Sequence, residues 1–208
     1  MFLDTSNYKL SFDDFNFYYK KIKSSSDEYL LLDFRPEEEI YNGFIPKTIS
    51  SDKGYFPRFV SKESKLLLII SSYYEDEVIS NLLEQGYNNI IGYLDGGIDT
   101  WIENKQGLTL FSECSNPNIC DSIIDCREPR EWNYGVVKSN SINYIQLGKL
   151  HTNWDQLNKN ITYGVVCKRG GRSLAATTYL MHKGLNVVNL SGGIRHLICG
   201  GFSLMKKC

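Results

Sequence analysis

The sequence predicts an α/β protein made of two similar domains, and three observations support this prediction. Short apolar runs alternate with amphipathic stretches along the 208-residue chain, a pattern typical of strands that alternate with helices. Strands joined by helices form mainly parallel sheets that are covered on both faces. A set of landmark residues also recurs after about 95 positions, a period that is too long for a solenoid and matches a duplicated small domain.

The landmark residues keep their order in both halves of the chain. Four of them recur at a constant offset of 92 positions, namely Asp33, Arg35, Glu39 and Gly43 as Asp125, Arg127, Glu131 and Gly135. Farther along, Gly96-Gly97-Ile98 is matched by Gly192-Gly193-Ile194 at an offset of 96. The offset changes because the loops differ in length, while the succession of landmarks is kept.

Each copy contains three clear strands and one clear helix. In the first copy the apolar runs predict strands at 29–33, 66–71 and 90–94, with a helix near 75–85. In the second copy they predict strands at 122–126, 163–167 and 187–190, with a helix at 173–183 that Gly184 ends. The aperiodic stretch 112–118 is rich in turn formers and predicts a linker between a first domain at 1–111 and a second at 119–208.

Composition and charge exclude several classes of protein. The formal net charge of −1 is the sum of two halves of opposite charge. Residues 1–104 contain 10 Lys+Arg and 18 Asp+Glu, whereas residues 105–208 contain 13 Lys+Arg and 6 Asp+Glu. No apolar run approaches the roughly 20 residues of a membrane span. The N-terminus lacks a basic segment followed by an apolar one, so we expect a cytoplasmic location. The sequence contains no basic run with interleaved aromatic residues, so nucleic-acid binding is not expected. It also contains no polybasic patch that would predict membrane binding.

All six cysteines lie in the second half of the chain, and they neither form a CxxC pair nor cluster with histidines. A zinc site is therefore not expected. In a reducing compartment we expect free thiols, and Cys199 and Cys208 are not expected to pair with Cys167.

One segment carries a pattern that points to chemistry. Cys167 stands at the end of a buried strand and is followed by a basic loop and the start of a helix, in the order Lys168, Arg169, Gly170, Gly171, Arg172 and Ser173. The two glycines allow backbone N–H groups to converge on the sulfur, and a helix N-terminus favours an anion. Together with the three cations, these features favour a thiolate over a thiol.

With this order of strand end, cysteine, basic glycine loop and helix start, the chain resembles the tandem rhodanese family of sulfurtransferases. In the second copy, Ile124 to Trp132 is similar to the family's first signature, residues 167–173 to its active-site loop, and Leu190 to Gly193 to the segment before its last helix. The resemblance implies two rhodanese-like domains, each with a mainly parallel five-stranded sheet flanked by helices on both faces.

The resemblance also implies a reaction that needs no metal or organic cofactor. Cys167 would take a sulfane sulfur from an anionic donor, thiosulfate-like or a persulfide, and pass it from a Cys167 persulfide to a thiol or another thiophilic acceptor. Residues 168–172 would form the cradle around the terminal sulfur. Arg127 is expected to help hold the donor with Asp125 in support; the alternative for this pair is a structural salt bridge.

Two other functions remain open beside an enzymatic sulfurtransferase. One is a sulfur-carrier or regulatory module without turnover of its own. The other is a cysteine phosphatase or arsenate reductase, which the loop disfavours: four residues separate Cys167 from Arg172, whereas cysteine phosphatases place five there. No acidic residue lies in the loop or the following helix to protonate a leaving alcohol.

The first copy lacks these chemical groups. Its corresponding loop, placed at 71–77, has no cysteine and no glycine, and it carries three carboxylates where the second copy has three cations. We therefore expect an inactive first domain. The first-copy segments 42–49 and 86–97 also resemble the tandem rhodanese tail of proteins that fuse a metallo-β-lactamase-like hydrolase to rhodanese domains. This resemblance implies a hydrolase of that class as a partner or as a missing fusion segment.

Overall fold

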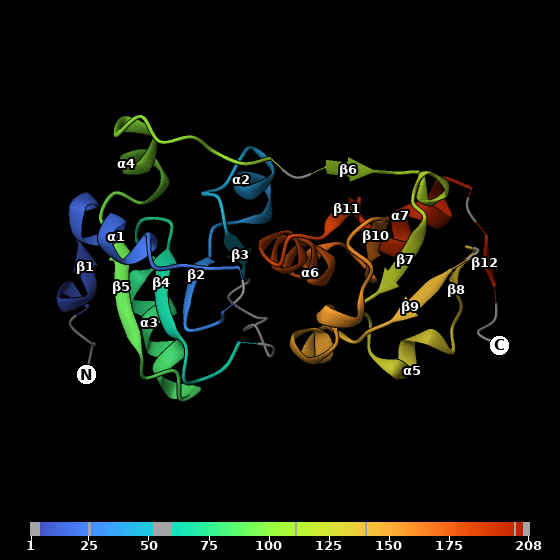
Figure 1. Ribbon diagram of the computed structural model, residues 1–208, viewed down its shortest axis with the longest axis horizontal. Coiled ribbons are helices and arrows are strands. Elements are labelled where there is room, and N and C mark those ends of the chain that lie inside the picture. The colour runs from blue at the N-terminus through green and yellow to red at the C-terminus, as the bar shows by residue number, and fades with distance from the viewer. Residues whose placement is uncertain are drawn as a thin grey trace. The chain divides into compact units, whose positions relative to one another are not determined.

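The computed structural model describes residues 5–24, 26–51, 60–110, 112–139, 141–201 and 203–205. The chain divides into two compact units, Met1–Leu110 and Phe111–Cys208. Each unit is built around its own five-stranded sheet (Figure 1).

The first unit holds a parallel sheet with the strand order β1-β5-β4-β2-β3. Its strands are β1 (Lys9–Leu10), β2 (Tyr29–Asp33), β3 (Thr48–Ser50), β4 (Lys65–Ile69) and β5 (Ile90–Leu94). Its α-helices are α1 (Phe12–Tyr19), α2 (Glu37–Tyr41), α3 (Glu75–Glu84) and α4 (Gly97–Glu103), with a 3-10 helix at Ser6–Tyr8.

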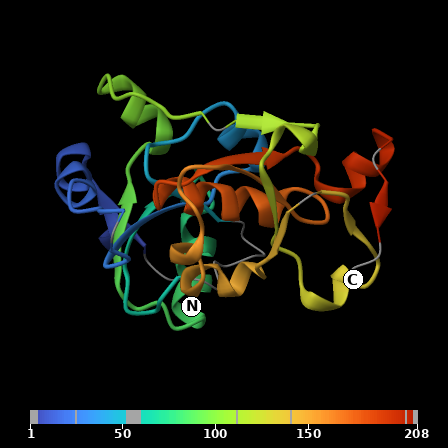
Figure 2. The ribbon, with the colours of Figure 1, turned by 45° about the vertical axis from the view of Figure 1, so that its right-hand side comes forward.

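Helices cover both faces of this first sheet. Phe15 of α1 and Trp101 of α4 pack with Leu31, Leu67 and Ile69 in one buried cluster. The helix α3 lies on the opposite side of the sheet from α1 (Figure 2) and buries Val78, Ile79 and Leu82, which are spaced as one helix face. The central strands are buried on both faces, so their sequences read as continuous apolar runs.

The second unit repeats this topology. Its parallel sheet has the order β6-β11-β10-β7-β9, which matches the first sheet strand for strand. The strands are β6 (Ser112–Cys114), β7 (Ser122–Asp125), β9 (Ile142–Tyr144), β10 (Thr162–Val166) and β11 (Asn186–Leu190); β8 (Val136–Val137) pairs separately with β12 (Leu204–Met205). The α-helices are α5 (Pro129–Trp132), α6 (Gly171–His182) and α7 (Gly193–Cys199), with 3-10 helices at Pro117–Ile119, Leu147–Thr152 and Trp154–Gln156. The α/β prediction of two parallel five-stranded sheets flanked by helices is thus confirmed.

The predicted elements agree with the observed ones to within two residues, but the stretch 112–118 differs from its prediction. Instead of a linker, Ser112–Cys114 forms β6, the edge strand beside β11, and Pro117–Ile119 forms a 3-10 helix. The strand was missed because a short edge strand with one face in solvent carries no apolar run.

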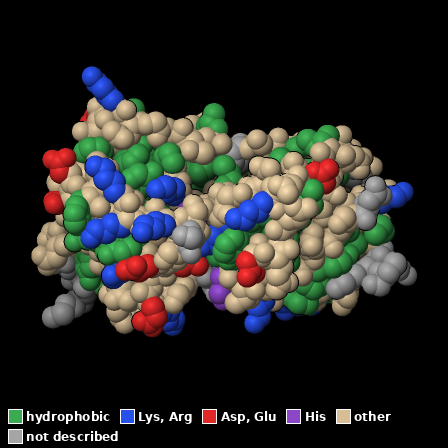
Figure 3. All heavy atoms as spheres, in the orientation of Figure 1, with side chains coloured by type: hydrophobic (Ala, Val, Ile, Leu, Met, Phe, Trp, Pro, Cys, Tyr) green, Lys and Arg blue, Asp and Glu red, His purple; other side chains and the backbone are tan. Residues whose placement is uncertain are grey.

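None of the described helices combines the length and the apolar composition that a membrane span requires. Within the described ranges, histidine, cysteine and carboxylate side chains do not gather in groups of three that could hold a metal ion. On the face of the molecule in Figure 3, lysine and arginine side chains of the first unit stand among acidic ones, so the negative balance of residues 1–104 does not produce a uniformly acidic surface.

Candidate active site

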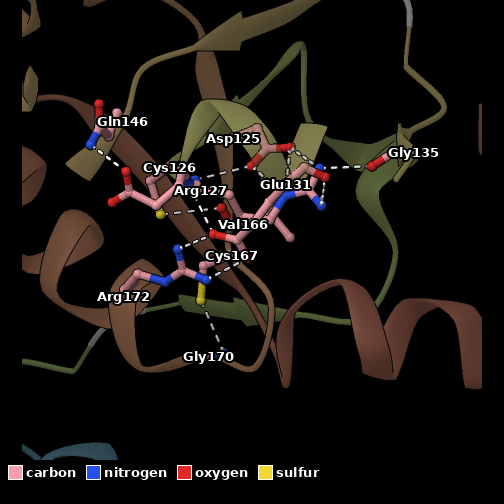
Figure 4. A network of polar contacts seen from close by, with 11 residues as sticks. Asp125, Cys126, Arg127, Glu131, Gly135, Gln146, Val166, Cys167, Gly170 and Arg172 are labelled. Atoms are coloured by element: carbon pink, nitrogen blue, oxygen red, sulfur yellow. Dashed lines mark hydrogen bonds and ion pairs between the residues drawn. The ribbon is translucent and has the colours of Figure 1, made fainter. Parts of the chain in front are cut away.

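Two neighbouring strand ends of the second unit bring the candidate site together. Asp125, the last residue of β7, pairs with Val166, the last residue of β10. The ladder extends by one step, because Cys126 N–H donates to the Val166 carbonyl at 2.9 Å. Asp125, Cys126 and Arg127 therefore lie directly beside Cys167 at the carboxyl edge of the sheet (Figure 4), where α/β proteins place their ligands.

The loop from Cys167 to Arg172 curls over the sulfur as the sequence predicts. The Gly170 N–H donates to the Cys167 sulfur at 3.1 Å, and Gly170 has φ 121°, a conformation that favours glycine. The helix α6 begins at the next residue, so its N-terminus faces the same sulfur. Ser173 donates from its hydroxyl to the Gly170 carbonyl at 2.8 Å and fixes this turn.

The helix α7 holds the loop from the other side. The Ile194 N–H donates to the Cys167 carbonyl at 2.8 Å, and the Arg195 N–H donates to the Lys168 carbonyl at 3.3 Å. Gly193, with φ 64°, lets the first turn of α7 approach the loop backbone, since a Cβ at this position would lie 2.5 Å from the Cys167 oxygen. This contact links the Gly192-Gly193 landmark to the cysteine loop.

The environment of Cys167 stabilises its thiolate. The pKa of Cys167 is lowered from 9.0 to about 5, chiefly by the hydrogen bond with the Cys126 thiol. Burial opposes this shift, because only 1% of the residue is exposed, and hydrogen bonds from the backbone N–H groups of Gly170 and Ser173 add to it. Hydrogen bonds to the charged form are therefore the main reason for a thiolate at neutral pH.

Arg172 of the loop is paired with a carboxylate rather than free. Its guanidinium binds Glu131 in a bidentate ion pair at 2.5 and 2.9 Å. The pair is partly buried, and it lowers the pKa of Glu131 to about 2 and raises the pKa of Arg172. Glu131 also accepts from the Glu128 N–H at 3.0 Å, so it connects α5 to the cysteine loop.

Arg127 lies in a buried ion pair with Asp125, the structural salt bridge that was the alternative expectation for this pair. Its guanidinium binds Asp125 at 2.7 Å and donates to the carbonyls of Gly135 and Glu131 at 2.8 and 3.0 Å. The first unit contains the same arrangement at Arg35, which binds Asp33 at 2.7 Å. Because this buried pair is present in a unit without a cysteine, its shared role is to fix the turn after β7 or β2.

The other two cations of the loop, Lys168 and Arg169, are exposed to solvent. They were predicted to stabilise the thiolate, yet the largest contributions to that stabilisation come from hydrogen bonds. Their position leaves them available to an approaching anion. The sequence reasoning missed Cys126; the available signal was its place at one strand end in the segment IIDCR, with Cys167 at another in VVCKR.

The equivalent position in the first unit is occupied by Ile70. Ile70 directly follows β4, as Cys167 follows β10, and a Cβ at Gly97 would lie 3.2 Å from its carbonyl oxygen. The corresponding loop thus starts one residue earlier than the sequence comparison placed it. A pocket of about 820 Å³ at this edge has Glu75, Asp76 and Asp95 in its lining, together with Lys9, which forms an ion pair with Asp95.

Comparison with known proteins gives one family match. Residues 111–197 match the model of the rhodanese-like domain. No functionally curated protein is significantly similar to this sequence.

Among solved structures, a rhodanese-related protein from Thermoplasma volcanium is 37% identical, and the match covers 41% of this chain and 84% of that one with a TM-score of 0.39. A thiosulfate sulfurtransferase from Pseudomonas aeruginosa is 15% identical over 95% of this chain and 40% of that one, with a TM-score of 0.42. A single-domain sulfurtransferase from Saccharomyces cerevisiae is 18% identical over 50% of this chain and 94% of that one, with a TM-score of 0.39. The chain described here therefore carries a rhodanese-like domain, formed by its second unit.

Proposed function

We propose that this protein is a sulfurtransferase that carries a sulfane sulfur as a persulfide on Cys167. The observation that carries the proposal is the placement of the Cys167 sulfur, which accepts a hydrogen bond from the Gly170 N–H at the start of α6, where its pKa is lowered to about 5. A stabilised thiolate is the nucleophile that attack on a sulfur–sulfur bond requires.

The proposed reaction has two displacements. In the first, the Cys167 thiolate attacks the outer sulfur of an anionic donor such as thiosulfate or a low-molecular-weight persulfide, and the donor's remaining anion leaves. The N–H groups of the loop then face the new terminal sulfur, and Lys168 and Arg169 attract the anionic donor from solvent. In the second displacement, a thiol or another thiophilic acceptor attacks the terminal sulfur and restores the thiolate.

The pairing of Arg172 supports sulfur transfer over phosphate chemistry. A cysteine phosphatase needs the loop arginine to grip the equatorial oxygens of the phosphoryl group. Here the Arg172 guanidinium is bound in bidentate fashion by Glu131, and the short loop leaves less room above the sulfur. Hydrolysis of an aryl phosphate without sulfur loading of Cys167 would favour the phosphatase or arsenate reductase instead.

Intact-mass analysis after incubation with donors tests the proposal. Thiosulfate, mercaptopyruvate and glutathione persulfide are the donors to compare. We expect the protein to gain one sulfur atom, a Cys167→Ser variant to gain none, and a Cys199→Ser variant, which changes an exposed thiol, to behave like the wild type. Failure of every donor to add sulfur would contradict the proposal.

A sulfur-carrier or regulatory module is the second candidate. In this case we propose that the partner is a metallo-β-lactamase-fold hydrolase and that the first unit takes no part in the chemistry. Steady-state turnover of thiosulfate with cyanide distinguishes the two candidates: sustained turnover that is lost in Cys167→Ser indicates an enzyme, and loading without turnover indicates a carrier.

A further inference from the structure

Cys126 is a second thiol buried against the first, and the proposed transfer reaction does not use it. Both residues are about 99% buried, and they follow paired strand ends. The two thiols are also hydrogen-bond partners. Of the five cysteines that the structure describes, these two stand next to each other at one edge of the sheet; Cys208 lies outside the described residues.

The backbone geometry allows a bond between the two sulfurs. Laterally paired residues of a sheet have Cα atoms about 4.8 Å apart, which lies within the range of about 4.4–6.8 Å that disulfides span. Cys126 and Cys167 each come one residue after the pair of Asp125 and Val166, so their side chains leave the sheet on the same face. A disulfide between them therefore needs no change of strand register.

The direction of approach matters for a displacement. The Cys167 sulfur points toward Gly170, where the outer sulfur of a persulfide would lie, and in Figure 4 the Cys126 sulfur lies away from Gly170. A nucleophile that displaces this outer sulfur has to attack the inner sulfur from the side opposite the leaving group.

The resting state keeps Cys126 protonated. Burial and the neighbouring Cys167 thiolate both raise the pKa of the Cys126 thiol well above its usual range. Its single proton has two acceptors, the Val166 carbonyl at 3.2 Å and the Cys167 sulfur. Once Cys167 carries a second sulfur, the negative charge lies on the outer sulfur of the persulfide. This outer sulfur can then accept the Cys126 proton as it departs.

We propose that Cys126 discharges the Cys167 persulfide as hydrosulfide and closes a Cys126–Cys167 disulfide. The Cys126 sulfur bonds to the Cys167 sulfur, the bond from Cys167 to the outer sulfur breaks, and the Cys126 proton passes to the departing sulfur. The outer sulfur is reduced to hydrosulfide and the two cysteines are oxidised to the disulfide, so no external oxidant is needed. A dithiol then reopens the bridge by thiol–disulfide exchange. The inference rests on the proposed persulfide of Cys167.

This step makes the protein a hydrosulfide-releasing enzyme when no acceptor arrives. Protonation of the Cys126 thiol at neutral pH slows internal discharge, which leaves time for an acceptor thiolate to take the sulfur. The persulfide is thus passed on when an acceptor is present and is removed when none comes.

The test follows a loaded protein after the donor has been removed, without oxygen and without reductant. Wild type, Cys126→Ser, Cys126→Ala and the control Cys199→Ser are loaded with thiosulfate and followed by intact mass and by released hydrosulfide. We expect wild type and Cys199→Ser to lose the added sulfur, release one equivalent of hydrosulfide and end two hydrogens lighter than unloaded protein. Both Cys126 variants should retain the sulfur at least tenfold longer. Peptide mapping should locate the new bond between Cys126 and Cys167.

The remaining outcomes are separable. A wild-type persulfide that persists as long as that of both Cys126 variants overturns the inference while the proposed function stands. Sulfur recovered on Cys126 with no hydrosulfide released also overturns it, because it means attack on the outer sulfur. If no variant with an intact Cys167 gains sulfur, the proposed function fails and the inference fails with it. Two different substitutions at position 126 are used in case one of the variants misfolds. Circular dichroism shows whether each variant is folded.

Discussion

Replacing Gly193 by alanine is expected to displace the Cys167 loop. A Cβ at Gly193 would lie 2.5 Å from the Cys167 oxygen and 2.8 Å from the Arg169 nitrogen and the Lys168 carbonyl carbon. These are all backbone atoms of a loop held between β10 and α6, so they cannot yield as the end of a flexible side chain does. Either the loop or the first turn of α7 has to move.

Three contributions set the size of the effect. The left-handed conformation at Gly193 costs an alanine about 1–2 kcal/mol, and forcing packed atoms apart adds about 1–3 kcal/mol. The hydrogen bonds from Ile194 and Arg195 to the loop then weaken as well, at about 0.5–1.5 kcal/mol each if lost. The conformational and packing contributions alone predict a loss of roughly 2–5 kcal/mol in the free energy of unfolding, and weakened hydrogen bonds add to it.

Gly184→Ala is the matched control. Gly184 follows α6 with φ 78°, and nothing lies within 4 Å of a Cβ there. The control therefore has the conformational cost of about 1–2 kcal/mol without the clash.

Denaturant unfolding measures the free energies, and the rate of Cys167 alkylation by iodoacetamide at neutral pH reports on the loop. We expect Gly193→Ala to be destabilised more than Gly184→Ala and to alkylate more slowly, because a displaced loop removes the Gly170 N–H from the sulfur and raises the pKa of Cys167. Equal unfolding free energies and equal alkylation rates in the two variants would refute this reasoning.

Three further predictions concern charge. Alkylation of Cys167 should show a midpoint near pH 5, since its pKa is lowered to about 5; a midpoint at an ordinary thiol value would contradict the described environment. Glu131→Gln should destabilise the second unit by about 1 kcal/mol at neutral pH, because Arg172 loses a bidentate partner in a partly exposed pair. The pKa of Glu131 is lowered to about 2, so its contribution is complete above pH 4.5 and is lost as the pH falls toward 2; denaturant unfolding of the variant and the wild type should converge there, and a constant difference would count against the pair. Asp33→Asn and Asp125→Asn each leave a buried arginine without its carboxylate and should cost about 3–5 kcal/mol in unfolding free energy, whereas a loss below about 1 kcal/mol in either would show that the pair is not structural.

The order of elements could be predicted from sequence because the signals are local. Continuous apolar runs mark β2, β4, β7 and β10, since strands buried on both faces require them. The short edge strands β1 and β6 escaped prediction because their partly exposed residues lack such a pattern. The loop after Cys167 was predictable for the same local reason, as glycines, cations and a helix start follow one another within seven residues.

The partners of the candidate site depend on contacts between distant parts of the chain. Arg172 meets Glu131 across 41 positions, and Cys126 meets Val166 across 40. Which strand ends become neighbours is decided by the order β6-β11-β10-β7-β9, and no local pattern contains that order.

The sequence by itself thus determined an α/β chain with one cysteine loop, because apolar periodicity, glycine and charge act over a few residues. Only the tertiary structure decided that Arg127 belongs to a buried ion pair, that Gly193 supports the loop, and that Cys126 lies against Cys167. Each of these depends on which strand ends meet, and that is settled by packing of the whole sheet.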